Sequence, residues 1–394
     1  MKVLIFNSGS SSLKFALFEA EHERSLAEGS IDWAHEPTLL VVNRPDQSTA
    51  KKELKIRGHA QAIGSILDQL SDDAEIAVVG HRVVHGGERY TSAVQITPDV
   101  EKYLVGLEEL APLHNAASLE VIRAAQQLLP NIPHFAAFDT AFHSTLSAAA
   151  RTYPVPRQWT IDWHVRRYGF HGLSHSYCAT RAAAMLARND LRLIIAHLGN
   201  GASVSAVNHG ISVDTSMGFT PLDGLMMGTR SGSVDPGILI YLLRHKGMNA
   251  DQLDHALNFE SGLLGVSGVS SDMRDVLAAS LGNPDARLAV DVYVHRLVQT
   301  IGAMAATLGG VDALVFTAGV GEHSPEIRQR VCRNLSFLGL ELDEAANALR
   351  HPDADIASAK SKNRILIIST HEELTILREI RRLTDSPQFK GNKK

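Results

Sequence analysis

A chain of 394 residues is too long for one ordinary hydrophobic core, so its length predicts two domains. Hydrophobic residues make up 44% of the chain, and a net charge of -5 without a basic stripe argues against a nucleic acid or an acidic membrane as partner. The two cysteines, Cys178 and Cys332, form no C-x-x-C motif and no 18-residue apolar run occurs, so we expect a cytoplasmic protein without a disulfide framework.

The chain begins with a predicted hairpin whose strands are Lys2–Phe6 and Leu13–Phe18. The turn between these strands is rich in hydroxyl groups. Hydroxyls, backbone N–H groups and a nearby ammonium group can all donate hydrogen bonds to phosphate oxygens. The turn therefore predicts nucleotide binding, and its candidate ligands are Ser10, Ser11, Ser12 and Lys14.

A P-loop is the first alternative for this segment. It requires a glycine directly before the lysine, a serine or threonine after it, and a helix beyond. Here Leu13 precedes Lys14 and Phe15 follows it, in an alternating pattern that is typical of a strand. The P-loop is therefore excluded, whereas a serine-rich turn that only joins two strands stays open as an alternative.

A second strand-turn-strand unit follows two segments with helical periodicity, Asn115–Leu129 and Ser176–Ala187. The strands of this unit are Leu191–Ala196 and Ala202–Val207, and its glycine turn, 197–201, aligns with the first turn. The similarity indicates a duplicated module. The alternation of strands and helices predicts an α/β fold with a mixed sheet in each half.

A third glycine turn, 318–322, follows the predicted strand Ala313–Thr317. Ser324 is a suitable N-cap and Pro325 a suitable first residue for the next helix, whose N-terminus can face a ligand. The turn is no dinucleotide fingerprint, because Ser324 stands where the third glycine belongs. A plain helix cap is the alternative.

Charged and polar side chains lie next to glycines in four further segments. Glycine lets the backbone approach a ligand while the neighbouring side chain is presented on a loop, which predicts binding or catalysis. Two histidine pairs in these segments have the spacing of a helical zinc site but lack the H-E-x-x-H glutamate, so we do not expect zinc. The segments are 80–87, 138–143, 168–175 and 227–232.

In this order, the motifs resemble those of the acetate kinase family. The match runs from N-S-G-S-S-S-L-K through G-H-R-V-V-H-G-G, F-D-T-A-F-H, Y-G-F-H-G-L-S-H, H-L-G-N-G, M-G-T-R-S-G and T-A-G-V-G-E to H-E-E-L, and it spans nearly the whole chain. The resemblance implies an α/β fold of two duplicated actin-like (ribonuclease H-like) domains with mixed sheets and an interdomain nucleotide cleft. It implies one domain of residues 1–145 plus 377–394 and a nucleotide-binding domain of residues 146–376.

The resemblance also implies a homodimer that reversibly converts ATP and acetate to ADP and acetyl phosphate with Mg²⁺, or with Mn²⁺ in its place. The implied catalytic residues are Asp139, His171, Arg82 and Arg230, and the implied metal ligands are Asn7 and Glu372. Arg82 would bind acetate, in a pocket lined by Val84, Leu113, Phe170 and Pro221. The implied nucleotide ligands, besides the hairpin turn, are His197, Leu198, Gly199, Asn200, Gly201, Asp272, Met273, Arg274, Gly319, Val320, Gly321, Glu322 and His323. His323 and His371 stand where the family commonly has asparagine.

The residue types also suit this chemistry. A free carboxyl group titrates near about 4, so a carboxylate acceptor is ionised at neutral pH and attacks the γ-phosphate without a general base. The reaction instead requires cations that reduce the repulsion between two anions, which Arg82, Arg230, His171 and Mg²⁺ would supply. Asp139 would then orient a partner or support the metal. A sugar hydroxyl as acceptor would need Asp139 as a base, which separates the two hypotheses.

Structural roles stay open for several of these residues. His171 could be a structural histidine, Asp139 a helix cap, Arg82 half of an ion pair, and Glu372 a favourable charge at a helix N-terminus. The alternative functions are a propionate or butyrate kinase with the same mechanism, and an actin-like or chaperone-like ATPase.

Overall fold

The computed structural model describes residues 1–9, 12–33, 37–45, 47–56, 58–70, 75–107, 112–349 and 352–385, the side chains of 112–114 excepted. The chain divides into two compact units, one of Met1–Phe142 with His371–Lys394 and one of His143–Thr370. The boundary expected between residues 376 and 377 lies inside a helix, Glu372–Thr384, which belongs wholly to the first unit.

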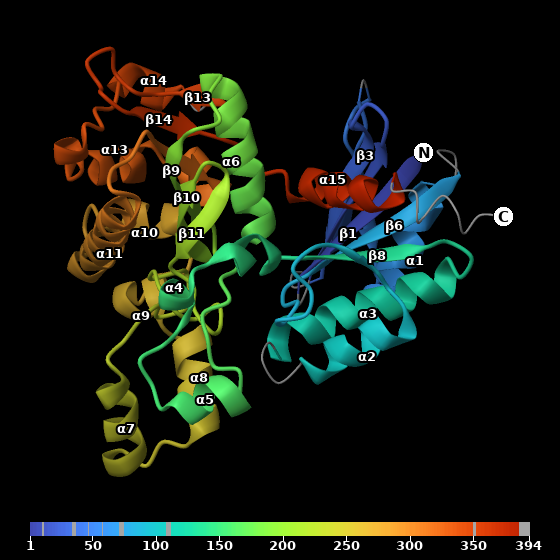
Figure 1. Ribbon diagram of the computed structural model, residues 1–394, viewed down its shortest axis with the longest axis horizontal. Helices are drawn as coiled ribbons and strands as arrows, with labels where there is room; N and C mark the ends of the chain where they lie inside the picture. Colours follow the sequence, from blue (N-terminus) through green and yellow to red (C-terminus); the bar gives the residue numbers. More distant parts are fainter. Residues whose placement is uncertain are drawn as a thin grey trace. The chain divides into compact units, whose positions relative to one another are not determined.

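The first unit is built on one mixed sheet. Its strands are β1 (Lys2–Ser8), β2 (Ser12–Glu19), β3 (Arg24–Asp32), β4 (Thr38–Asn43), β5 (Ala50–Leu54), β6 (Ile76–Val83), β7 (Val94–Gln95) and β8 (His134–Phe138). They lie in the order β5-β4-β3-β2-β1-β6-β8-β7 (Figure 1). Since β1, β6 and β8 run parallel to one another, their carboxyl ends meet at one edge of the sheet.

Helices cover both faces of this first sheet. They are α1 (His59–Gln69), α2 (Pro98–Gly106), α3 (Pro112–Leu128) and α15 (Glu372–Thr384). Leu4 and Phe6 of β1 pack in one buried core with α1 and α3, as the alternation of strand side chains requires. On the opposite face α15 lies close to β6, because a Cβ at Gly80 would come within 2.6 Å of Ile380.

The second unit contains a smaller mixed sheet with strand order β11-β10-β9-β12-β14-β13. Its strands are β9 (Arg192–Leu198), β10 (Ala202–Asn208), β11 (Ile211–Thr215), β12 (Ala313–Thr317), β13 (Ala354–Asp355) and β14 (Arg364–Ile367). β9 pairs antiparallel with β10 and parallel with β12, which in turn runs parallel to β14.

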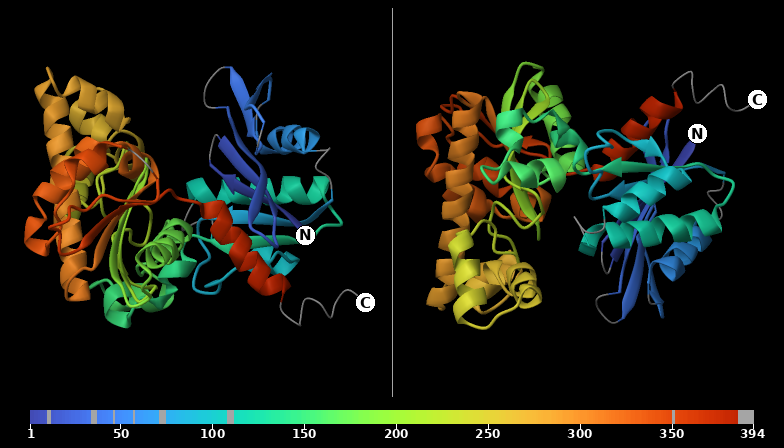
Figure 2. Two further views of the ribbon diagram at one scale, coloured as in Figure 1. Left: turned by 90° about the horizontal axis from the view of Figure 1, so that it is seen from above. Right: turned by 60° about the horizontal axis from the view of Figure 1, so that its bottom comes forward.

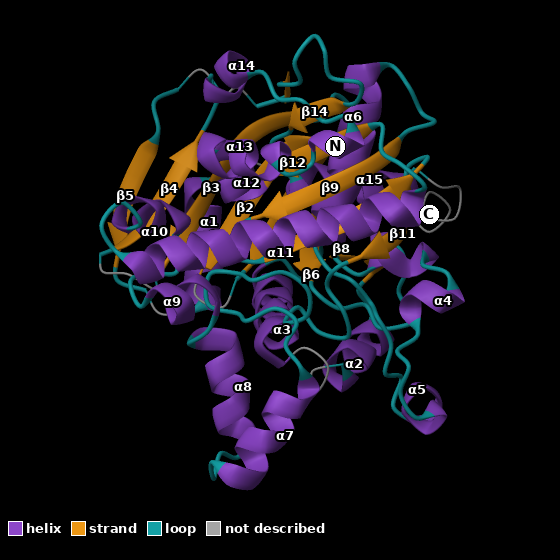
Figure 3. Cartoon of the chain, turned by 90° about the vertical axis from the view of Figure 1, so that its left-hand side faces the viewer, coloured by secondary structure: helices purple, strands orange, loops and turns teal. Residues whose placement is uncertain are grey.

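The helices of the second unit pack on both sides of its sheet. They are α4 (Ala148–Arg151), α5 (Arg157–Asp162), α6 (Gly172–Leu186), α7 (Pro236–His245), α8 (Ala250–Phe259), α9 (Gly262–Ser267), α10 (Met273–Ala279), α11 (Pro284–Leu308), α12 (Ala318–His323), α13 (Pro325–Arg333) and α14 (Glu344–Ala348). α6 and the long helix α11 lie on opposite sides of β9 and β10 (Figures 1 and 2). α11 lies along one face of this sheet (Figure 3) and contacts β9, β10 and β11. In the described part of the chain, no helix has the length and apolar character needed to cross a membrane.

The two sheets repeat one arrangement. In each, a central strand (β1 or β9) has an antiparallel hairpin partner on one side and two successive parallel strands on the other. The prediction of two duplicated actin-like domains with mixed sheets is therefore confirmed. Two local predictions are wrong: the segment 318–322 forms the short helix α12 rather than an open turn, and α6 begins at Gly172, four residues before the predicted start.

Candidate active site

Polar side chains gather where three parallel strands of the first unit end. Asn7 lies near the end of β1, Arg82 near the end of β6, and Asp139 directly follows β8. Glu372 and Glu373 open α15 and hydrogen-bond to Asn7. We call these five residues the Arg82 cluster.

Arg82 is held in a fixed orientation by two-point pairing. Its Nε lies 3.2 Å from Oδ1 of Asp139 and its Nη2 lies 2.5 Å from Oδ2, while Nη1 donates to Oδ1 of Asn7 at 3.2 Å. Burial opposes the charged guanidinium, but the carboxylates of Asp139, Glu372 and Glu373 outweigh this effect and raise the pKa of Arg82. The group is therefore a permanent, oriented cation.

The predicted metal ligands are in direct contact. Nδ2 of Asn7 donates to Oε2 of Glu372 at 2.9 Å and to Oε1 of Glu373 at 3.1 Å. Amide and carboxylate oxygens suit Mg²⁺, which usually takes one or two carboxylates and fills its other positions with water and phosphate oxygens. Among the described residues, no cluster of three His, Cys, Asp or Glu could hold a metal. The pair therefore fits a magnesium ion that shares its coordination with a phosphate.

The first hairpin places Lys14 beside this cluster. Lys14 lies directly opposite Asn7 in the β1–β2 register, and its side chain is exposed. The turn is closed by a hydrogen bond from the Gly9 N–H to the Ser12 carbonyl at 2.8 Å. Ser10 lies outside the described residues. Sequence reasoning missed His59, the first residue of α1. Its Nε2 lies 3.2 Å from the carbonyl oxygen of Gly9 in this turn.

His171 and Arg230 lie side by side in the second unit. A Cβ on Gly201 would come within 3.0 Å of Arg230 Nη2 and 3.4 Å of His171 Nε2, so both groups lie tightly against this glycine. Nη1 of Arg230 donates to the Pro221 carbonyl at 2.8 Å. Burial lowers the pKa of Arg230, and no carboxylate among the described residues pairs with it. Its charge is therefore available to an anionic ligand.

Three further histidines surround His171. The ring of His197 stacks on that of His171 with a centroid distance of 4.2 Å, while His143 and His175 lie behind it. His171 and His175 both contact the hydroxyl of Ser203, at 2.9 and 2.8 Å. Sequence reasoning weighed the spacing of His171, the N-cap of α6, and His175 only as a zinc site and missed Ser203, the hydroxyl that both rings share.

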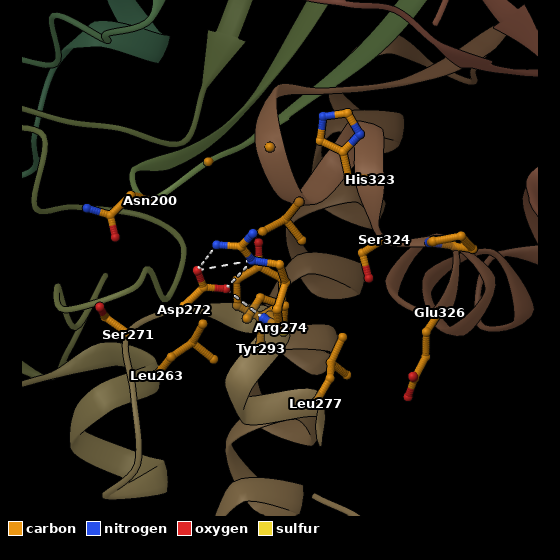
Figure 4. Close-up of a pocket in the computed structure, with 15 residues that line it drawn as sticks. Asn200, Leu263, Ser271, Asp272, Arg274, Leu277, Tyr293, His323, Ser324 and Glu326 are labelled. Carbon is orange, nitrogen blue, oxygen red and sulfur yellow. Dashed lines mark hydrogen bonds and ion pairs between the residues drawn. The ribbon is translucent and has the colours of Figure 1, made fainter. Parts of the chain in front are cut away.

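A cavity of about 830 Å³ lies in the second unit, bordered by α9–α13 and the turn after β9 (Figure 4). Many of the expected nucleotide ligands line it: Gly199, Asn200, Asp272, Met273, Arg274, Gly319, Val320 and His323. Ser324 and Pro325, at the N-terminus of α13, also line it, as the capping pattern predicted. Sequence reasoning missed Leu263, Leu277 and Tyr293.

Charged and polar side chains line this cavity together with apolar ones. Asp272 and Arg274 form an ion pair, and hydrogen bonds from Arg274 lower the pKa of Asp272 (Figure 4). Burial raises the pKa of Tyr293, whose hydroxyl has no hydrogen-bond partner among the described residues. The remaining walls are mainly apolar, as expected of a site for a planar base.

The other nucleotide ligands expected in the second unit do not line the cavity. They are His197, Leu198, Gly201, Gly321 and Glu322. His197 and Gly201 lie next to His171 instead. The carboxylate of Glu322 accepts hydrogen bonds from the Ala318 N–H at 2.9 Å and the Thr370 N–H at 3.1 Å, so it holds α12 in place.

The residues expected around the acetate methyl group are distributed over both units. Val84 is buried at the end of β6 in the first unit, and Phe170 is buried just before α6 in the second. Pro221 lies in the second unit, where its carbonyl accepts from Arg230. The side chain of Leu113 lies outside the described part of the chain.

Comparisons with known proteins give one consistent family. The sequence model of the Acetokinase family matches residues 2–378. An acetate kinase from Gloeobacter violaceus is 50% identical, with 96% of this chain and 98% of that protein covered. A propionate kinase structure from Francisella tularensis is 38% identical with a TM-score of 0.90, covering 96% of this chain and 98% of that one. An acetate kinase structure from Porphyromonas gingivalis is 40% identical with a TM-score of 0.87, covering 98% and 99%.

Proposed function

The chain belongs to the acetokinase family, and from this premise we propose that it transfers the γ-phosphoryl group of ATP to the carboxylate of acetate. The products are acetyl phosphate and ADP, the transfer is direct and in line, and the reaction is reversible. The carboxylate is already ionised, so no proton has to be removed from it. The enzyme's task is to bring two anions together and to stabilise the charge on the transferring group.

The observation that carries this proposal is the fixed cation in the Arg82 cluster. Asp139 pairs with Arg82 at two points and so acts as an orienting group rather than as a base. Arg230 and His171, adjacent at Gly201, add a second cation and a hydrogen-bonding imidazole.

Asn7 and Glu372 would hold the magnesium ion, with manganese as a substitute. The bound ion would neutralise part of the negative charge of the phosphates. The cavity beside Asp272 and Arg274 would take the adenosine of ATP, with the phosphates directed toward Asn200 and the helix N-terminus at Ser324.

A hydroxylamine trap for acyl phosphates tests the function. The enzyme is incubated with ATP, Mg²⁺ and hydroxylamine together with acetate, propionate or butyrate, and the hydroxamate formed is measured. We expect acetate to give the highest kcat/KM. A preference for propionate would support the alternative of a propionate kinase, whereas ATP hydrolysis without hydroxamate would support an actin-like ATPase and refute the proposal.

Val84 is the residue that we expect to set chain length. Its branched side chain is buried and would crowd the longer acyl group of propionate. Val84→Ala should raise kcat/KM for propionate relative to acetate by about 5- to 100-fold, since a methyl-sized change in an apolar pocket is worth about 1–3 kcal/mol. An unchanged ratio would show that other residues set the chain length. Val105→Ala, an exposed substitution in the same unit, is the matched control.

A homodimer is the assembly that we propose for this chain. α7 is rich in apolar residues but has no buried residue. Four of its apolar side chains are between 44% and 50% exposed: Ile238, Ile240, Tyr241 and Leu243. Clustered apolar side chains of this kind are typical of a surface that another protein covers. We also expect the enzyme in the cytoplasm, because both of its buried cysteines are free.

A further inference from the structure

A row of buried hydrogen bonds leads away from His171 between α6 and β10. Oγ of Ser203 lies 2.9 Å from Nδ1 of His171 and 2.8 Å from Nε2 of His175. Oγ of Ser205 lies 2.7 Å from Nδ1 of His175. His175, Ser203 and Ser205 are completely buried. We call these four residues the His171 chain.

The His171 chain has two possible proton arrangements. A hydroxyl and a neutral imidazole each have one proton to donate, so all bonds must run in the same direction. Burial lowers the pKa of His175 well below its usual value of 6.5, which keeps this ring neutral. Either Ser205 donates to His175, which donates to Ser203, which donates to His171, or every bond is reversed.

The partners of Ser205 decide between the two directions. In the reversed arrangement the Ser205 hydroxyl proton needs another acceptor. Within the described chain, His175 is the one side-chain or backbone group that hydrogen-bonds to the Ser205 hydroxyl. An unpaired buried donor is costly, so the direction from Ser205 toward His171 is the stable one. It gives Nδ1 of His171 a donated hydrogen bond and leaves the ring proton on Nε2.

We propose that the His171 chain fixes His171 in the tautomer with its proton on Nε2, the nitrogen that lies beside Gly201 and Arg230. This inference rests on the proposed function, which places His171 at the transferring phosphoryl group. A neutral imidazole in this tautomer donates a hydrogen bond to a phosphoryl oxygen, and no proton is transferred. The other tautomer would present a lone pair to the anion and repel it.

Ser203 and His175 are therefore positioning residues. They act through His171, whereas His197 holds the plane of the same ring by stacking at 4.2 Å and is itself bonded to Ser174 at 2.8 Å. If Ser203 and His175 had a purely structural role, substituting them would affect folding but would not change which nitrogen of His171 carries the proton.

Nitrogen-15 NMR of the histidine side chains tests the proposal in the full-length enzyme without turnover. The His171 signals are assigned with a His171→Gln variant. In the unmodified enzyme we expect Nε2 protonated and Nδ1 unprotonated. Ser203→Ala should give a mixture of tautomers and lower kcat by about tenfold, the scale of one positioning hydrogen bond. The KM for ATP should change by less than about twofold, because the substrate contacts stay in place.

Two variants serve as controls. Ser203→Thr keeps the hydroxyl and should restore both the tautomer and most of kcat. Ser212→Ala removes a similar hydrogen bond, 2.8 Å long, from the neighbouring His143 and should leave His171 unchanged.

Protonation on Nδ1 of His171 in the unmodified enzyme would overturn the inference. So would a Ser203→Ala enzyme with the original tautomer and kcat. The spectrum of the unmodified enzyme decides the tautomer even where Ser203→Ala fails to fold. A failure to form acyl phosphate would refute the proposed function but would leave the tautomer result unaffected, so the two failures are distinguishable.

Discussion

Arg82 combines charge with a fixed direction, and at the scale of single residues this combination is the main feature of the site. Asp139 and Asn7 together contact all three nitrogens of its guanidinium. Lysine would keep the charge but could not reproduce the two-point contact with Asp139. The contribution of orientation can therefore be measured separately from that of charge.

We expect Arg82→Ala to lower kcat at least about a hundredfold, since an arginine that stabilises a transferring phosphoryl group is worth roughly 10³ to 10⁵. Arg82→Lys should fall between this variant and the unmodified enzyme. The measurement is the rate of hydroxamate formation at saturating acetate and ATP. Arg89→Ala, which removes an exposed arginine stacked over Tyr90, should stay within about twofold of the original rate. Near-normal turnover in Arg82→Ala would exclude a role of this arginine in transfer.

The buried His143 makes the free energy of unfolding depend on pH in the acidic range. Burial lowers its pKa from the usual 6.5 to about 4, whereas the unfolded chain regains the usual value. Between pH 6.5 and 4 the unfolded state thus binds more protons, so the free energy of unfolding falls as the pH falls. The contribution of His143 is fully present above pH 6.5 and amounts to about 3 kcal/mol, lost progressively toward pH 4.

Urea unfolding at several pH values between 7 and 4 measures this dependence. His143→Gln should reduce the slope of unfolding free energy against pH by about one proton. His255→Gln, which removes an exposed histidine on α8, is the matched control. An unchanged slope in His143→Gln would show that this ring does not titrate differently on unfolding.

Motif residues were easier to predict than their partners. Arg82, Asp139 and Glu372 stand in polar, glycine-containing or charged segments, which marks them in the sequence. Ser203 and Ser205 alternate with apolar residues in β10 and are indistinguishable from ordinary strand serines until the structure places α6 above them. Hydrogen-bonding partners across elements depend on tertiary packing, which local sequence patterns do not encode.

At the scale of elements, α12 shows how packing overrides a turn signal. Its glycines predict an open turn, yet Glu322 accepts from the Ala318 N–H at the start of this helix. At its end, the buried Arg328 donates to the carbonyls of Gly321 and Glu322, each at 2.8 Å. The same guanidinium bonds to Asn347 of α14. Residues from three elements thus shape one wall of the cavity proposed to bind the nucleotide.

We expect Arg328→Met to lower the free energy of unfolding by about 3 kcal/mol, because buried carbonyls lose their donors. The KM for ATP should rise about tenfold with little change in the KM for acetate, since α12 lines the nucleotide cavity and positioning contacts are worth about that much. Thermal unfolding and steady-state kinetics measure both effects. Arg333→Met is the matched control on the same helix, where an exposed ion pair with Glu344 contributes less than about 1 kcal/mol. Equal KM values for ATP in both variants would contradict the role of Arg328.

At the scale of the whole molecule, the duplicated sheet explains where the functional residues stand. In both units the residues of the candidate site lie at or directly after the carboxyl ends of corresponding strands: Asn7 at the end of β1 and Gly199 after β9, Arg82 at the end of β6 and Gly319 after β12. The alignment of the two glycine turns indicated this relation in the sequence. The unit boundary was harder to predict from the sequence, because α15 joins the first unit through contacts with strands that lie far from it in the chain, β1, β2, β6 and β8.

Assembly is the last property that the surface predicts. Since α7 exposes Ile238, Ile240, Tyr241 and Leu243 together, a second copy of the chain that covers them would remove a large apolar area from water. We expect the enzyme to sediment at twice the mass of its chain and Ile240→Asp with Tyr241→Glu to sediment as a monomer. Leu128→Glu changes a similarly exposed residue on α3 of the other unit and should leave the dimer intact. A monomeric unmodified enzyme would refute the proposed dimer. A double variant that still dimerises would place the interface elsewhere, because charged groups buried without partners at the contact are too costly to tolerate.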